Sequence, residues 1–500
     1  MKKVFVILSA LLLTLSLCGC TQLGEFLIHV GTAIEAGAGE TTAAVPETEE
    51  ETTETEAAAT TEAVTTEAVT TEAVTTETTA AVTAAAPDNG EPAQTTEAAD
   101  EEWHYTVQVV RTEHKYKAED GTVIATKSYE QPVLRLENES GEIFGGSKPE
   151  RGVTAEQLAA CRAFEAETAS TGLWARDVEE AGREIYEARG KGDGGMPNIF
   201  HEVRVSSINQ QGSLLSVLAT DYIYLGGVHP DYGLHSWNFD LRKGEFVDLE
   251  SLTDLPDDLK EAFAFEIAMQ AENSEFADGL SGDWFDRILN KETFEVHFDE
   301  DSITVWFQEY ELGPLALGVP VFEVPYGILS RYLNDYGEQL LDLPAEARVI
   351  GVFLEAQDLW TWLESGAPKD YNDEKTEGEI QYHRISDPNI HSLADLSAML
   401  SQYIEKSYVD EQLAKNQVLR EFDGALYAAA VGRGADMTIA WVDYAAEIDG
   451  ESGKVIVTIH RRDYDDESGK WLLTGDSDVL EFPFKLQDGR PVFSTMSLIY

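Results

Sequence analysis

The sequence is short of basic residues. Its 500 residues include 35 Lys and Arg against 93 Asp and Glu, which gives a formal net charge of −58. Nucleic-acid-binding proteins depend on Lys and Arg to neutralise phosphates, so this charge excludes a nucleic-acid partner. With 10% aromatic residues the chain nevertheless has enough apolar side chains to build hydrophobic cores. We therefore expect folded domains with an acidic surface.

The shortage of basic residues is most extreme near the amino terminus. No Lys or Arg occurs between Lys3 and Arg111, while residues 21–102 contain 19 acidic residues. From Trp103 onward there are 33 basic and 74 acidic residues, a net charge of −41. Such a surface steers basic proteins toward it, although solubility alone also accounts for an acidic surface.

Cysteine is scarce too, and two of the three cysteines lie at the end of an apolar run. Lys2 and Lys3 precede fourteen residues, Val4 to Leu17, which are typical of a secretory signal peptide and too few for a membrane span of about 20 residues. The following Cys18-Gly-Cys20 resembles a bacterial lipobox. This resemblance implies that Cys20 carries the lipid and that residues 1–20 leave as a signal peptide. It places the protein on the outer face of the cell membrane. An ordinary signal peptide is the alternative.

The remaining cysteine, Cys161, lies in a stretch with helical character. It has no partner left for an intramolecular disulfide. No His motif surrounds it, so we expect a small buried apolar side chain rather than a nucleophile.

Residues 21–102 have the composition of a tether. Residues 41–100 contain 19 Thr, 16 Ala and 12 Glu, the pentad Thr-Thr-Glu-Ala-Val recurs from Thr60 to Glu77, and no aromatic residue occurs between Phe26 and Trp103. This segment cannot bury enough apolar area to offset chain entropy, so we expect a disordered stalk that extends toward the cell wall. Its length as a flexible coil is about 50 Å.

The amino-acid composition changes at Trp103, where aromatic and basic residues return. The pattern of apolar residues in 103–500 predicts an α+β fold with antiparallel sheets and packed helices. Strand-like alternation in 105–110 and 122–136 surrounds the turn Asp120-Gly121, and Thr154 with Gln157 forms a candidate capping box. A helical run to about Arg189 and further alternating segments follow. We divide the folded part into an N-terminal subdomain at 103–205, a second subdomain at 206–342 and a C-terminal domain at 343–500.

Two short segments contain motif-like patterns of glycine and proline. One is Tyr224-Leu-Gly-Gly-Val-His-Pro230, and the other runs from Tyr310 through Gly313-Pro314 to Pro-Tyr326. Over roughly 103–340 the chain resembles the RsiV/PdaC-type extracellular domain of unknown function, which occurs in a lysozyme-sensing anti-sigma factor and beside a peptidoglycan deacetylase domain. This resemblance implies lysozyme as one basic partner. The chain has neither the cytosolic sigma-binding segment nor the deacetylase domain.

These two segments are the candidate binding loops. Their candidate residues are Gly226, Gly227, His229, Asp231, His235, Tyr310, Gly313 and Pro314. The glycines and the proline first suit strand ends and an irregular crossover. His229, Asp231 and His235 could in principle reach one Zn²⁺. The two His residues are six apart and no third His lies nearby, so we expect capping and turn roles, with no metal and no cofactor.

The C-terminal domain has helices first and a run of strands afterwards. Helical segments at about 352–363, 392–406 and 409–415 precede strands near 426–431, 437–442, 455–460 and 479–484. This order resembles a cystatin- or NTF2-like domain, and it is also similar to bacterial inhibitors of cell-wall endopeptidases of the IseA kind.

No catalytic signature is present. The sequence contains no Gly-x-Ser-x-Gly elbow, Ser-x-x-Lys, Cys-x-x-Cys or Walker A motif, and His201-Glu202 lacks the second His of a zincin. We therefore expect a non-enzymatic, lipid-anchored cell-surface protein of the bacterial envelope that binds lysozyme or another basic protein at the cell wall. The alternatives are an inhibitor or regulator of cell-wall hydrolases and an unrecognised envelope hydrolase.

Overall fold

The structure is a computed structural model of the 500-residue chain. It describes residues 102–169, 178–189, 198–274, 276–364, 367–430, 436–466 and 470–499, together with the backbone of residues 71–78. The predicted signal peptide, Cys20 and most of the predicted tether therefore lie outside the described residues. Within them, no helix is both long and apolar enough to cross a membrane.

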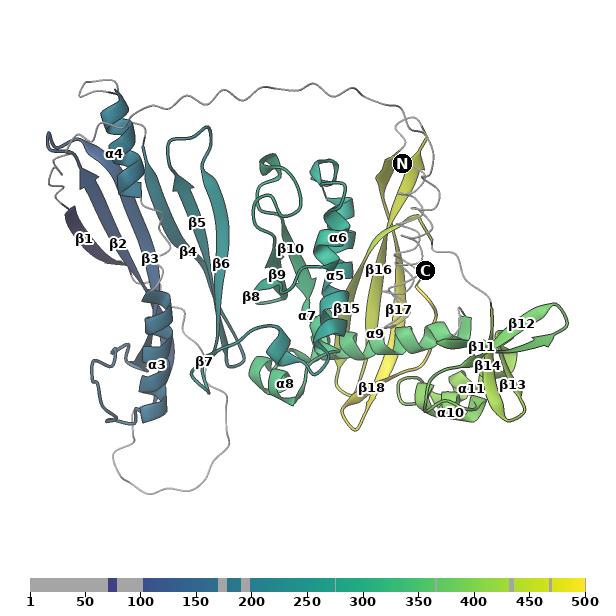
Figure 1. Cartoon of the computed structure of the whole chain (residues 1–500). Helices are drawn as coiled ribbons and strands as arrows, with labels where there is room; N and C mark the ends of the chain where they lie inside the picture. Colours follow the sequence, from purple (N-terminus) through teal and green to yellow (C-terminus); the bar gives the residue numbers. More distant parts are fainter. Residues whose placement is uncertain are drawn as a thin grey trace, which may run out of the picture.

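The first sheet contains seven strands in sequence order (Figure 1). They are β1 (Thr71–Thr78), β2 (Trp103–Lys117), β3 (Val123–Asn138), β4 (Phe200–Gln211), β5 (Leu214–Tyr224), β6 (Asp231–Asp240) and β7 (Glu245–Phe246). Neighbouring strands are antiparallel except for β3 and β4. The hairpin predicted around Asp120-Gly121 is confirmed as β2–β3. The strand β1 lies in the predicted tether, where a coil was expected, and pairs with β2.

Two helices pack on one face of this sheet, α3 (Ala155–Thr168) and α4 (Val178–Arg189). The capping box of α3 is confirmed, because Thr154 and Gln157 exchange side-chain-to-backbone hydrogen bonds. The Phe164 ring of α3 meets the Phe239 ring of β6 with centroids 5.3 Å apart. The division predicted between residues 205 and 206 falls inside β4, so both predicted subdomains contribute to one sheet.

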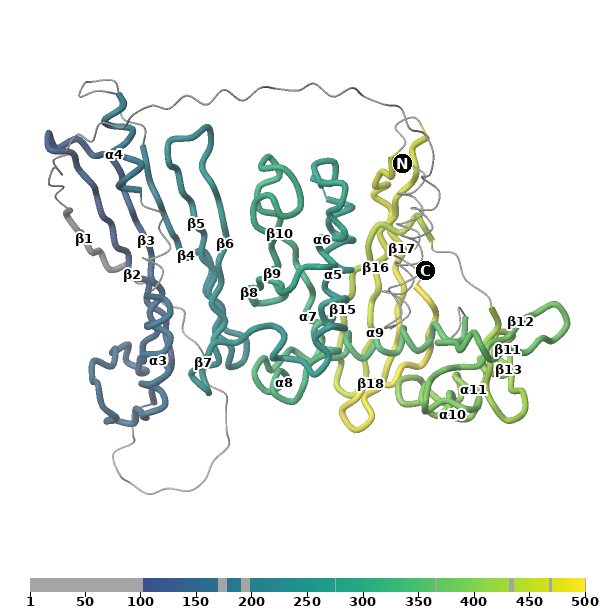
Figure 2. The backbone as a smooth tube through the Cα atoms, in the orientation of Figure 1, coloured from purple at the N-terminus to yellow at the C-terminus, as the bar shows by residue number. Residues whose placement is uncertain are grey.

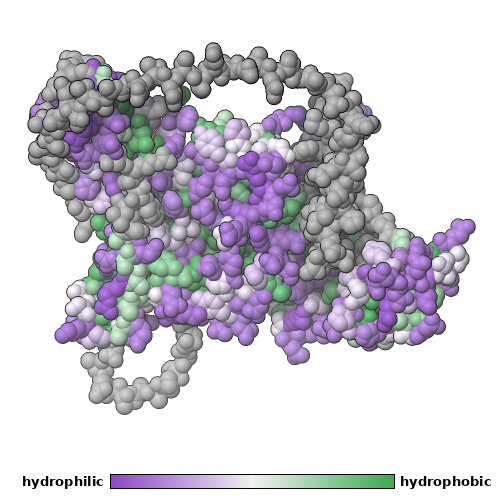
Figure 3. All heavy atoms as spheres, viewed as in Figure 1, coloured by the Kyte–Doolittle hydropathy of each residue, from purple (hydrophilic) through white to green (hydrophobic). Residues whose placement is uncertain are grey.

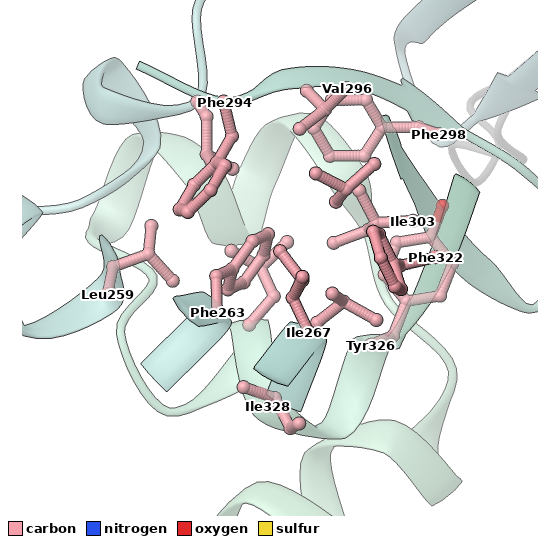
Figure 4. Packing of buried hydrophobic residues seen from close by; sticks show 14 of the residues in the cluster. Leu259, Phe263, Ile267, Phe294, Val296, Phe298, Ile303, Phe322, Tyr326 and Ile328 are labelled. Carbon is pink, nitrogen blue, oxygen red and sulfur yellow. The ribbon is translucent and has the colours of Figure 1, made fainter. Parts of the chain in front are cut away.

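The second unit is a small α+β layer around a three-stranded antiparallel sheet of order β10-β9-β8. Its elements are η2 (Glu250–Leu252), α5 (Pro256–Asn273), η3 (Ala277–Gly279), α6 (Trp284–Leu289), β8 (Glu295–Phe298), β9 (Ser302–Trp306), η4 (Leu315–Leu317), β10 (Val321–Pro325), α7 (Tyr326–Ser330) and α8 (Asp335–Leu341). In α5, Leu259, Phe263 and Ile267 recur every four residues and form one apolar face. That face packs against Phe294 and Phe322 in the core (Figure 4).

This second unit also covers part of the first sheet. The Asn238 side chain of β6 donates to the Val296 carbonyl of β8 at 2.9 Å, and the Ser216 hydroxyl of β5 lies 2.7 Å from the His297 ring. These contacts are on the sheet face opposite α3 and α4, which we call the open face. The side chains of Tyr222 and Tyr232, on the open face, are each more than one-third exposed. The second unit therefore covers only part of this face.

The C-terminal part begins with α9 (Ala345–Glu364), which runs from the second unit toward the last helices (Figure 2). A four-stranded antiparallel meander packs on α9, with Phe353 and Phe482 ring centroids 4.8 Å apart. Its strands are β15 (Ile439–Asp449), β16 (Ser452–Asp465), β17 (Lys470–Gln487) and β18 (Arg490–Phe493). The predicted strands near 437–442, 455–460 and 479–484 lie in this meander, whereas the predicted strand near 426–431 lies in another sheet. The predicted order, with every helix before the strands, is wrong, because two strands lie between α9 and the next helix.

A separate sheet of order β11-β12-β14-β13 accompanies α10 and α11. Both helices and the strand β14 were predicted, but β11, β12, β13 and their separate sheet were not. Its elements are β11 (Lys369–Glu377), β12 (Ile380–Ile385), α10 (Leu393–Leu400), α11 (Lys406–Lys415), β13 (Leu419–Phe422) and β14 (Ala425–Ala429). The strand β11 is strongly charged and mostly accessible to solvent. It lacks the alternation of apolar and polar residues from which a strand can be predicted. The fold class is α+β with mainly antiparallel sheets, as predicted.

Candidate functional site

The structure brings the two candidate loops together at one end of the open face. The loop between β5 and β6 holds residues 225–230, and the other loop follows β9. The Gln308 side chain donates to the Leu234 carbonyl at 2.8 Å, and the Glu309 carboxyl accepts the Tyr232 backbone N–H. Both loops lie at the same end of their sheets in Figure 1. The second loop therefore shields the edge of β6, whose backbone groups would otherwise face solvent.

The glycines and the proline of these loops have backbone tasks. Gly226 has φ +89°, and a Cβ there would lie 2.4 Å from Ile185 Cδ1 of α4. A Cβ on Gly313 would lie 2.7 Å from the Gly279 carbonyl, and Pro314 directly precedes η4. The positive φ thus favours glycine at position 226, and the close approach of a backbone carbonyl requires it at position 313.

Two apolar side chains of the loops face solvent. Val228 is 99% exposed and Tyr310 is 57% exposed. Tyr310 also has φ +69°, a left-handed conformation that large side chains rarely adopt and that costs about 1 kcal/mol. Arg287 fixes this turn, because its guanidinium donates to the carbonyls of Tyr310 and Glu311 at 3.2 and 2.9 Å. The loop is held in an unfavourable conformation that presents an aromatic ring outward.

The carboxyl of Glu309 lies beside these exposed groups. Burial, the largest cause, raises its pKa, and the nearby charge of Asp231 raises it further. The N–H of Tyr232 and the charge of His229 act in the opposite direction without cancelling the rise. Two acidic side chains, one at the start of β6 and one in the loop after β9, therefore share a region where an added cation would be favourable.

The three residues considered for a metal do not converge. The His229 Nδ1 lies 3.3 Å from the Pro230 carbonyl, whereas the His235 Nε2 lies 3.8 Å from an Asp221 oxygen. Across the described ranges, no three His, Cys, Asp or Glu side chains are arranged to hold a metal ion.

The structure instead reveals a carboxylate between two histidines, which the sequence did not single out. Asp221 of β5 accepts from His201 of β4 at 2.6 Å and has His235 of β6 on its other side. Burial opposes ionisation of Asp221, but the two histidines outweigh it and lower its pKa to about 2. Only the strand register brings these three residues together, so no local pattern could have shown them.

A buried group of Ser, His and Asp contains the residue types of a catalytic triad but differs from one in geometry. His297 is fully buried, and its Nε2 lies 3.0 Å from the Ser207 hydroxyl and 3.1 Å from Asp299. In a triad the Ser and the Asp meet different ring nitrogens. Here Ser207 and Asp299 both meet Nε2. The Ser216 hydroxyl lies 2.7 Å from Nδ1, but it is fully buried, donates to the Asn238 side chain and accepts from the Phe298 N–H. Burial lowers the pKa of the imidazole. This geometry suits a structural link between the two sheets.

Cys161 is buried on α3, as expected. Burial raises the pKa of its thiol to about 11, so the reactive thiolate is rare at neutral pH.

Comparison with known proteins identifies one segment. Residues 250–327 match the family described as "Protein of unknown function (DUF3298)". These residues run from η2 to the start of α7. No curated protein matches the chain.

Two solved structures are similar. A crystal structure of a DUF3298 family protein from Pseudomonas aeruginosa PAO1 has 14% sequence identity, a TM-score of 0.28, and coverage of 46% of this chain and 94% of that chain. A member of the same family from Bacteroides fragilis has 15% identity, a TM-score of 0.31, and coverage of 47% and 95%. Residues 250–327 of this chain form a DUF3298 domain.

Proposed function

We propose that this protein is a non-enzymatic binding protein of the bacterial cell envelope, held to the membrane by a lipid on Cys20. Its partner is a basic protein, of which lysozyme is the leading example. The partner meets the two loops at the end of the open face, through a surface formed by Val228, His229, Asp231, Glu309 and Tyr310, which we call the loop surface.

The conformation of Tyr310 carries this proposal. A ring that is 57% exposed contributes little to a core, yet its backbone is held at φ +69°. Strain of this kind persists where the surrounding structure enforces it, and it clusters at ligand-binding sites. Exposed tyrosines are also enriched among the residues that dominate protein interfaces. Val228, at 99% exposure, supplies apolar area beside a polar rim.

The negative charge near the loops favours a positively charged partner. Glu309 and Asp231 repel each other, and the raised pKa of Glu309 reports the cost of burying its charge. A Lys or Arg from a partner would offset that cost. The described surface is largely hydrophilic in the view of Figure 3, and residues 103–500 have a net charge of −41. Long-range attraction then accelerates encounter with basic proteins.

The amino terminus supports the location. The apolar run before Cys20 and the lipobox-like sequence are the features of an anchored exported protein. The Thr- and Glu-rich segment after it has no Lys or Arg, and it is long enough to hold the folded part away from the membrane.

Variants of the loop surface test the proposal with the full chain in detergent and a basic lysozyme. Tyr310→Ser and Val228→Ser should each weaken binding about tenfold, because each removes an exposed apolar contact. Val479→Ser is the matched control, since Val479 is 58% exposed on β17 of the C-terminal sheet. Equal affinity of the parent and both loop variants would refute the loop surface as the site.

A further inference from the structure

A row of aromatic rings crosses three strands of the open face. The Phe200 ring of β4 lies 5.2 Å from the Tyr222 ring of β5, which lies 6.5 Å from the Tyr232 ring of β6, centroid to centroid. The sheet register explains the row, because Tyr222 and Tyr232 are directly opposite one another and Phe200 is opposite Tyr224. Tyr222 and Tyr232 are 38% and 39% exposed.

These rings are not needed for the hydrophobic cores. The core clusters beside this sheet lie on the other face, with α3 and α4, or farther along the strands, where β8 covers the sheet. None of Phe200, Tyr222 and Tyr232 belongs to a core cluster of the described residues. Apolar side chains that gather on an exposed face, outside the core, are a common feature of binding sites.

Paired charges adjoin the rings on the same face. The Glu202 carboxylate, opposite Tyr222 in the register, lies 2.7 Å from Arg204 and 3.4 Å from Arg111, and it accepts from the Ser128 hydroxyl. Glu202 is therefore neutralised locally, on a chain whose net charge is −58. The paired charges around Glu202 distinguish this part of the open face from the loop surface, where Asp231 and Glu309 raise the local negative charge.

We propose that Phe200, Tyr222 and Tyr232, with Glu202 and Arg204, form a binding site for a glycan chain, which we call the aromatic platform. A sugar ring has an apolar C–H face that packs on an aromatic ring, and a rim of hydroxyls that needs planar donors and acceptors. The platform offers successive rings, followed by a carboxylate and a guanidinium, both fixed by their mutual contact. A nucleic acid also stacks on rings, but its phosphates would meet the acidic surface.

The paired charges also favour a neutral ligand over a basic protein. A cationic side chain would have to displace Arg204 or Arg111 from Glu202, whereas a hydroxyl can join their hydrogen bonds without separating charges. The site does not depend on the proposed function, because it uses neither Val228 nor Tyr310.

Oligosaccharide titration of the full chain in detergent tests this site. The probes are chitotetraose, whose acetamido groups also occur in cell-wall glycan, and cellotetraose, which lacks them. Isothermal titration calorimetry should show binding of at least one in the micromolar to millimolar range. Preference for chitotetraose would assign the site to acetamido glycans, and equal binding would assign it to β-linked glucans as well.

Three variants separate the platform from a structural effect. Tyr222→Ala and Tyr232→Ala should each weaken binding about tenfold, whereas Tyr222→Phe should retain most of it because it keeps the ring. Tyr371→Ala is the matched control, since Tyr371 is 66% exposed on β11. Unchanged thermal unfolding would show that the alanine variants fold. The proposal is overturned if neither probe binds at millimolar concentration, or if folded Tyr222→Ala binds as the parent does.

Discussion

Glu266 of α5 should make the stability of this protein fall as the pH rises from 4.5 to about 7. Its carboxyl lies where α5 meets β15 and accepts from the Gln270 side chain at 2.9 Å. Burial raises its pKa from 4.5 to about 7, and the charge of Asp443 on β15 adds to the rise although the Gln270 contact opposes it. Between pH 4.5 and about 7 the folded chain therefore keeps a proton that the unfolded chain has released.

The magnitude follows from this difference in proton binding. Below pH 4.5 both states are protonated at this position, and the folded state loses nothing. Between pH 4.5 and about 7 the unfolded state binds fewer protons, so the free energy of unfolding falls by about 1.4 kcal/mol per pH unit. Above about pH 7 both states are ionised and the loss is complete, at about 3 kcal/mol.

Glu266→Gln removes the ionisation and keeps the shape. The variant should match the parent near pH 4.5 and exceed its free energy of unfolding by about 3 kcal/mol above pH 7. Urea unfolding followed by tryptophan fluorescence, repeated between these limits, measures the difference. Glu338→Gln is the control, since Glu338 is an exposed residue of α8, and it should change stability by less than about 0.5 kcal/mol. A constant offset between Glu266→Gln and the parent over this pH range would refute the reasoning.

Three further predictions concern the first sheet. Gly226→Ala should lower the free energy of unfolding by about 1–2 kcal/mol in urea titrations because of its φ of +89° and the Ile185 contact, whereas Gly227→Ala, with no neighbour nearer than 3.8 Å, should change it little. Asp221→Asn should cost about 2 kcal/mol near neutral pH, and this loss should shrink as the pH falls below 3.8 through about 2, because a lowered pKa stabilises only the ionised form. Cys161 should react with a thiol reagent at about pH 8 only after denaturation, in a colorimetric assay, and rapid labelling of the folded chain would contradict its burial.

Features set by neighbouring residues could be predicted from the sequence. Asp120 and Gly121 predicted the β2–β3 hairpin, and Thr154 with Gln157 predicted the start of α3. Both predictions were possible because turns and caps depend on residues within a few positions of each other. The helix α9 and the later strands β15, β16 and β17 were also visible as apolar segments. The limits of β4 were harder, since the sheet continues through the predicted boundary at 205.

Features set by register and long-range contact could not be predicted. Tyr222 and Tyr232 each look like ordinary members of an alternating strand, and only their pairing forms the platform. The raised pKa of Glu266 depends mainly on its burial and then on the charge of Asp443, which is far along the chain. The candidate loops were visible because glycine and proline mark irregular backbone, but their meeting at Gln308 and Glu309 depends on how the two sheets pack.

The central claim is that an acidic surface protein binds a basic partner. The affinity of the full chain in detergent for native lysozyme should be measured at low and physiological salt, beside succinylated lysozyme, whose lysines have become acidic. The account predicts binding to native lysozyme that weakens as salt screens the charges, and no binding to the succinylated form. Absence of binding to native lysozyme even at low salt, or equal binding to both forms, would contradict it.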